Sequence, residues 1–149
     1  MKRIPASDSF TGLIAVLSDK LRERHPRDEI GLSYGCLCEG IAMLKIIGGY
    51  RENFAFDFDH VADSWFSHAL EQTLFQVVYW GGAAESRYGV YMTENQSRNR
   101  KKAVEEEYGL EGVKKIEEMA DKFEQYFKDK SEKGITLRSL IEEKSSKDK

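Results

Sequence analysis

The stretch LSYGCLCEGIAMLKIIGG, residues 32–49, decides the fold that the sequence predicts. It has the length of a helix, contains good helix formers and few polar residues, and closes at the pair Gly48-Gly49, a typical C-terminal stop. A helix with so little polar surface is buried on most sides. We therefore expect residues 32–47 to form a central helix around which the rest of the chain folds.

Apolar residues at helical spacing occur on both sides of this stretch. Before it, residues 10–21 carry such a stripe, and Pro26 ends the helix that it predicts. After it, the helical pattern returns from Asp59 and stops at Gly81-Gly82. These segments predict one helix before the central helix and one after it.

The last third of the chain also has helical signals. Thr93 and Gln96 have the spacing of a capping box, which predicts a helix over about 94–108. A second apolar stripe extends from Leu110 to Phe127. We expect this stripe either to join the core of a monomer or to mediate a homo-oligomer.

The expected fold class is all-α, a compact bundle of about five to seven helices in one domain over 1–149, with a frayed charged tail from about residue 144. Alternating phenylalanines allow a short strand near 53–58. A strand without a partner leaves its backbone groups unpaired, so we favour a turn of helix or an ordered loop there. The expected core consists of Leu13, Leu17, Leu37, Ile41, Leu44, Phe66, Leu70, Leu74 and Val77.

Composition excludes several classes of function. The formal net charge is −3 and the isoelectric point is about 5.7, so we expect no binding to nucleic acid. No apolar run reaches about 18 residues, and the start, MKRIPASDSF, lacks the apolar core of a secretory signal, so we expect neither a membrane span nor secretion by that route. Two closely spaced cysteines suit a reducing compartment, which predicts a cytoplasmic protein.

Cys36 and Cys38 suggest a metal site at first, but residues two apart on a helix point about 200° apart. They cannot both face one ion, and no histidine pair has ligand spacing. The residues from Asp57 fail the EF-hand pattern, and the glycine pairs lack the features of a phosphate loop. We expect no metal and no cofactor.

Cys38 is a candidate nucleophile because it lies where the central helix begins, and a helix N-terminus favours the thiolate. His60, which lies among aspartates, and His68 are the candidate bases. This residue set predicts a cysteine-dependent hydrolase or transferase. The competing interpretation is that Cys38 is a small core residue.

The segment Cys38-Glu39-Gly40-Ile41-Ala42-Met43, with Phe54 and Phe58 downstream, resembles the N-terminal cysteine segment of papain-like cysteine peptidase domains. Variants of that segment occur in type IV-secreted effectors of intracellular bacteria, and the tail LIEEKSSKDK resembles the ends of such effectors. The resemblance implies Cys38 as nucleophile and delivery into a host cytosol. Papain-like enzymes carry a Gln upstream and a His far downstream, whereas residues 31–34 contain no Gln and no His follows His68.

Tyr79, Trp80, Tyr88 and Tyr91 flank a glycine-containing link and are the residue types that dominate binding interfaces. They form either a lid on the core or a partner-binding surface. Because no complete catalytic set is evident, we expect first a small soluble acidic interaction or regulatory protein (effector-like, inhibitor-like or immunity-like) that binds another protein and catalyses nothing. The alternative is the cysteine-dependent enzyme.

Overall fold

The predicted central helix is present and buried. The computed structural model describes residues 2–62 and 64–147, and in it α2 (Tyr34–Ile46) begins after Ser33, whose hydroxyl accepts a hydrogen bond of 3.1 Å from the Cys36 amide. Leu37, Ile41 and Leu44 of α2 are fully buried. The stretch that decides the fold therefore lies in the core, as the sequence predicts.

Two long helices accompany α2, and the second of them packs against both α2 and the first. The first, α1 (Ala6–Arg24), ends just before Pro26, and the other, α4 (Glu94–Lys133), begins at the predicted capping box. Gly109 has a left-handed φ of 75° inside α4, so the two helices predicted in this part of the chain join across a kink. This merger is one reason why the described residues form five helices, at the low end of the predicted range.

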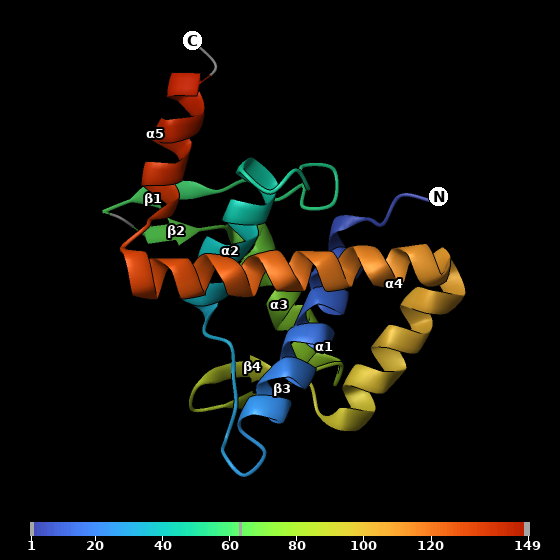
Figure 1. The fold of residues 1–149 in the computed structure, drawn as a ribbon. Coiled ribbons are helices and arrows are strands. Elements are labelled where there is room, and N and C mark those ends of the chain that lie inside the picture. The colour runs from blue at the N-terminus through green and yellow to red at the C-terminus, as the bar shows by residue number, and fades with distance from the viewer. Residues whose placement is uncertain (1, 63, 148–149) are drawn as a thin grey trace.

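Glycines let α4 approach both of its neighbours closely (Figure 1). A Cβ atom on Gly12 of α1 would lie 2.6 Å from the Ile116 side chain, and one on Gly40 of α2 would lie 2.1 Å from the Phe123 ring. The apolar stripe of residues 110–127 is thus covered mainly by α1 and α2, with Leu110 at its start 65% exposed. A homo-oligomer formed through the whole stripe would have to separate these helices.

The all-α prediction is wrong in part, because four short strands form two antiparallel hairpins. They are β1 (Asp59–Val61) with β2 (Ser64–Phe66), and β3 (Ala84–Ser86) with β4 (Gly89–Tyr91). The helix predicted from Asp59 begins only at His68. Residues 53–58 are irregular and not a strand, with Phe54 and Phe56 buried without sheet partners. In each hairpin a short strand pairs with the next strand in the sequence. The backbone groups of both strands thereby find hydrogen-bond partners.

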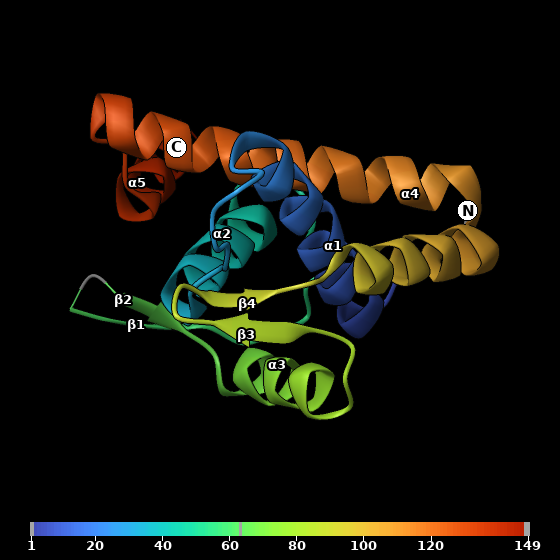
Figure 2. The ribbon, with the colours of Figure 1, turned by 90° about the horizontal axis from the view of Figure 1, so that it is seen from below.

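The second hairpin is anchored to the segment that leads into α2. Leu32 and Val90 exchange backbone hydrogen bonds of 2.7 and 2.9 Å. Gly89 (φ 129°) permits this approach, since a Cβ atom there would lie 2.1 Å from the Leu32 carbonyl oxygen. Figure 2 shows the result: α3 (His68–Tyr79) lies on the outside of the molecule, and β3 and β4 lie between it and the long helices.

Most of the expected core is confirmed. Phe66 and Val77 are only partly buried, whereas the other seven predicted core residues are buried. The last helix, α5 (Leu137–Lys147), begins after Thr136, which exchanges hydrogen bonds with Ser139 of 3.0 and 3.1 Å. The predicted tail from about 144 is helical to Lys147, and its last two residues lie outside the described part. Within residues 2–62 and 64–147, every helix is too short or too polar to cross a membrane.

Candidate functional site

Helix α3 is fixed to α2 at its first turn. Ser67 caps the helix by accepting a hydrogen bond of 3.2 Å from the Leu70 amide. The Tyr34 hydroxyl donates to the Ser67 carbonyl at 3.1 Å and accepts from the Ser67 amide at 3.2 Å. Leu70 and Leu74 then point into the core. These contacts determine which face of α3 is turned outward.

The outward face of α3 and its C-cap residue carry three aromatic side chains, Phe75, Tyr79 and Trp80, which we call the aromatic surface. Their exposed fractions are 71%, 72% and 80%. Phe75 and Tyr79 stack with ring centroids 6.3 Å apart, and Tyr79 meets Trp80 edge to face at 5.4 Å. Contiguous aromatic groups of this kind are unusual on a surface that has no partner.

The polar neighbours of the aromatic surface are two glutamines and one carboxylate. Helical geometry places Gln72 and Gln76 between and beside the aromatic positions. The last turn of α3 carries no basic residue, whereas the exposed Glu71 lies one turn before Phe75 on the same face. The surface therefore offers apolar area with amide donors and acceptors, and a single carboxylate, Glu71, at its edge.

The structure brings together only two of the four aromatic residues predicted to bind a partner. Tyr88 occupies the turn of the β3–β4 hairpin, at the end remote from Trp80, and is 52% exposed. Its ring contacts the Arg87 guanidinium at 5.1 Å, and Arg87 pairs with Glu29 at 2.9 Å. Tyr91 pairs with Ala84 in the hairpin and is partly buried.

Sequence reasoning missed Phe75, the third member of the aromatic surface. The signal was present in the spacing: Phe75 lies about 140° around the helix from Leu70, off the apolar stripe, and one turn before Tyr79. An aromatic residue off the buried stripe of an amphipathic helix is a candidate for an exposed binding group. A helical-wheel projection of α3 would have identified Phe75 as such a candidate.

The candidate nucleophile Cys38 lies in the core, and its side chain is fully buried. Burial raises the pKa of its thiol, although a hydrogen bond with Tyr34 opposes that shift. His60 is exposed in β1 and stacks on Trp65 at 4.4 Å, while His68 is exposed at the start of α3 and contacts the Phe66 ring edge to face at 6.2 Å. Among the interactions of the described residues, Cys38 has no histidine partner.

Cys36 is turned away from Cys38, as their spacing on a helix requires. It is partly exposed, and burial together with the nearby Glu39 raises the pKa of its thiol to about 11, a shift that Lys130 opposes. Both cysteines are free thiols. In the part of the chain that the structure describes, no three His, Cys, Asp or Glu side chains lie close enough to hold a metal ion.

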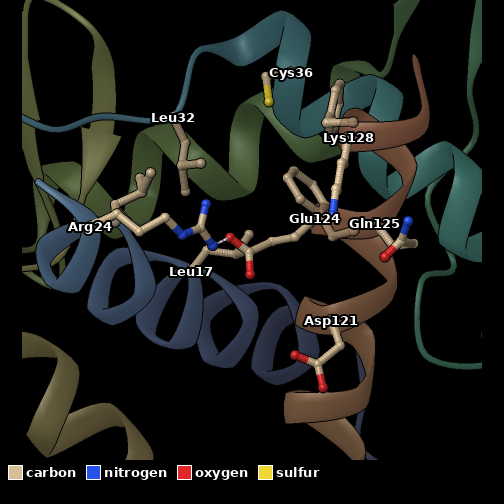
Figure 3. A pocket seen from close by; sticks show the side chains of 11 residues that line it. Leu17, Arg24, Leu32, Cys36, Asp121, Glu124, Gln125 and Lys128 are labelled. Carbon is tan, nitrogen blue, oxygen red and sulfur yellow. Dashed lines mark ion pairs between the residues drawn. The ribbon is translucent and has the colours of Figure 1, made fainter. Parts of the chain in front are cut away.

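A groove with a volume of about 730 Å³ lies where α1, the start of α2 and the second half of α4 meet (Figure 3). Arg24 of α1 forms an ion pair with Glu124 of α4 across it. Its apolar walls come from α1, from the residue two positions before α2, and from α4: Leu17, Leu21, Leu32, Phe123 and Phe127. The groove and the aromatic surface are formed by different helices and are separate features.

No family model, curated protein or solved structure matches this chain. A functional assignment must therefore come from the geometry of the aromatic surface, the buried thiol and the groove.

Proposed function

We propose that this protein acts by binding another protein, and that the aromatic surface of α3 is the centre of the interface. The observation that carries the proposal is the contiguous exposure of Phe75 and Tyr79 on α3 and of Trp80 at its C-cap. Aromatic side chains bury large areas at low cost in conformational entropy, and Trp and Tyr are enriched among the residues that dominate binding energy.

The chemistry of the surface defines the partner. Because the aromatic face is flanked by Gln72 and Gln76 and carries one carboxylate, Glu71, at its edge, its complement is an apolar pocket or groove with a polar rim. A strongly charged partner surface would lose its hydration against the aromatic rings and would gain no interaction that compensates for the loss. The partner that we propose is therefore a protein with a concave apolar site whose polar rim accommodates Glu71, and binding depends modestly on salt.

Two free thiols on opposite sides of α2 support a reducing compartment, which suits a cytoplasmic binding protein. The alternative function, an enzyme using Cys38, gains no support from a fully buried thiol whose pKa is raised. We therefore propose that the protein acts by binding another protein and not by catalysis at Cys38.

The test compares the wild-type chain with Trp80→Ala and with Leu110→Ala, a matched control that truncates an exposed apolar residue on α4. Each serves as bait for affinity capture, and the affinity of the captured protein is then measured with purified components. Loss of a central tryptophan should weaken binding by about 30-fold or more, since such residues contribute about 2 kcal/mol or more. The control should bind as the wild type does.

Tyr88→Ala tests the geometry more finely, because Tyr88 lies at the other end of the hairpin and contacts Arg87. We expect a smaller loss of affinity than for Trp80→Ala. Unchanged affinity in Trp80→Ala, or equal losses in Trp80→Ala and Leu110→Ala, would refute the proposed interface.

A further inference from the structure

The groove between α1, α2 and α4 has the dimensions of a small-molecule site. Its volume of about 730 Å³ lies inside the range of roughly 300–1,000 Å³ that is typical of such sites. Leu17 and Leu21 line it from α1, and Phe123 and Phe127 line it from α4. These walls would remove a hydrocarbon chain from water, which stabilises binding by about 0.8 kcal/mol for each buried methylene.

The groove lining carries Arg24 and Lys128 against Asp121 and Glu124, and Lys20 next to the lining adds a third cation. Asp121 pairs with Lys20 at 3.1 Å, and Glu124 pairs with Arg24 and also lies 3.7 Å from Lys20. Both acidic groups of the lining are thereby compensated. Lys128 also lines the groove, and within residues 2–62 and 64–147 it has no ion-pair partner. In Figure 3 its side chain extends toward the middle of the groove.

We propose that this groove binds a single-chain amphiphile with an anionic head group, of the fatty-acid class. The hydrocarbon chain lies against the leucine and phenylalanine walls, and the carboxylate pairs with Lys128. An unpaired ammonium beside an apolar trough complements an anion and opposes a cation. The Arg24–Glu124 pair holds α1 and α4 at a fixed separation and so sets the width of the groove.

Cys36 provides an internal reporter of occupancy. Its sulfur is turned toward the groove in Figure 3, whereas Cys38 is fully buried in the core. An alkylating reagent should therefore label Cys36 alone in the folded protein. Because the pKa of this thiol is raised to about 11, labelling should be slow at neutral pH and is best followed near pH 9.

The experiment measures the rate of Cys36 alkylation in the full chain by mass spectrometry, with dodecanoate added below its micelle concentration. We expect saturable protection with one ligand per chain. Dodecyltrimethylammonium, which has the same chain length and the opposite charge, should protect only at much higher concentration. Equal protection by both amphiphiles would overturn the anionic preference and with it the proposal.

Variants at position 128 test the head-group contact. Lys128→Gln should weaken dodecanoate binding roughly tenfold, as expected for the loss of one charge-assisted contact, while Lys128→Arg should retain most of the affinity. Lys114→Gln, which removes an exposed lysine elsewhere on α4, is the matched control and should bind as the wild type does. Identical affinities in Lys128→Gln and Lys114→Gln would overturn the proposal.

Two further outcomes would also overturn it. Labelling of both cysteines in dodecanoate would show that the amphiphile unfolds the protein instead of binding it. A labelling rate that falls as the protein is concentrated without ligand would show that a second copy covers the groove. None of these measurements involves the aromatic surface, so the groove and the proposed protein interface succeed or fail independently.

Discussion

The contact among α1, α2 and α4 differs sharply from α3 in how it uses apolar residues. In the three-helix contact, Gly12 and Gly40 let Ile116 and Phe123 lie directly against the neighbouring backbones. In α3, two leucines are buried, while three aromatic residues on the opposite face lie in solvent. Apolar content alone therefore does not distinguish a core helix from a binding helix, because α3 carries apolar residues on both faces.

The three-helix contact and α3 also differ in their polar contacts. Glu39 of α2 accepts a hydrogen bond of 2.7 Å from Tyr126, and Lys130 lies 2.7 and 2.9 Å from its two oxygens. These contacts link α2 to α4 across a largely buried boundary. The polar contacts of α3 with α2 are concentrated at its first turn, around Ser67 and Tyr34. We infer that stability is concentrated in the three-helix contact and that α3 is free to serve recognition.

Within the three-helix contact, the largest expected effect is that of Gly40→Ala. The added Cβ atom would lie 2.1 Å from the Phe123 ring, so either the ring or the helices must move. Overpacking of this kind typically costs 1–3 kcal/mol, and we expect about 3 kcal/mol of unfolding free energy here. Denaturant titration measures it.

Gly35→Ala is the control within the same helix, since its Cβ atom would meet nothing within 4 Å. It should be neutral or slightly stabilising, because alanine favours the helix. Combining Gly40→Ala with Phe123→Leu should recover part of the loss through non-additive coupling. Equal effects of the two glycine substitutions would mean that α2 and α4 do not interlock at Gly40.

A smaller loss is expected for Glu39→Gln. The amide can still accept a hydrogen bond from Tyr126, but the charge that compensates Lys130 is lost. We expect a loss of about 1.5 kcal/mol in denaturant titration, because the Glu39 side chain is only 15% exposed, whereas Lys130 is 41% exposed and stays partly hydrated. Glu117→Gln changes an exposed carboxylate of α4 and should leave stability within about 0.5 kcal/mol. An equal loss of unfolding free energy in Glu39→Gln and Glu117→Gln would contradict a specific contribution of Glu39 to the packing of α2 against α4.

Helix-scale features were predictable from the sequence because their signals are local. The end of α1 before Pro26, the capping box at Thr93 and the break near Gly109 all follow from the conformational limits of a few adjacent residues. The central helix was predictable from its length and its lack of polar residues. These features do not depend on distant contacts.

The hairpins and the aromatic surface depend on partners that the local pattern does not show. The β3–β4 hairpin is fixed by pairing of Val90 with Leu32, which lies 58 positions away. Whether Trp80 covers the core or faces solvent depends on where α3 docks, and Tyr34 helps to set that position through Ser67. The burial of Cys38 likewise follows from tertiary packing, which overrides the tendency of a helix N-terminus to favour the thiolate.

A still smaller effect on the unfolding free energy should appear at alkaline pH. The pKa of Cys36 is about 11 in the folded protein against an ordinary value of 9.0, so the folded state holds this proton more tightly. The resulting stability is complete below pH 9 and is lost as the pH rises toward 11. Cys38 adds to the loss above pH 9, and Tyr34 and Tyr108, with pKa values of about 12 against 10.0, add to it above pH 10.

Between pH 9 and 10.5, the unfolding free energy of Cys36→Ala should therefore fall by about 1 kcal/mol less than that of the wild type. Denaturant titration at each pH measures both. The two proteins should follow parallel curves below pH 8. A wild-type stability that stays flat up to pH 11 would show that this thiol is not desolvated and that the groove wall is more open than the structure has it.

The smallest expected effect is the sharpest test of the difference between the two regions. Replacing Phe75, Tyr79 and Trp80 together by serine should change the unfolding free energy by less than about 0.5 kcal/mol, because these side chains are mostly in solvent already. Leu70→Ala, on the buried face of the same helix, should cost about 3 kcal/mol by leaving a cavity. If the triple variant lost as much as Leu70→Ala, the aromatic surface would be covered in solution, and α3 would be a core helix.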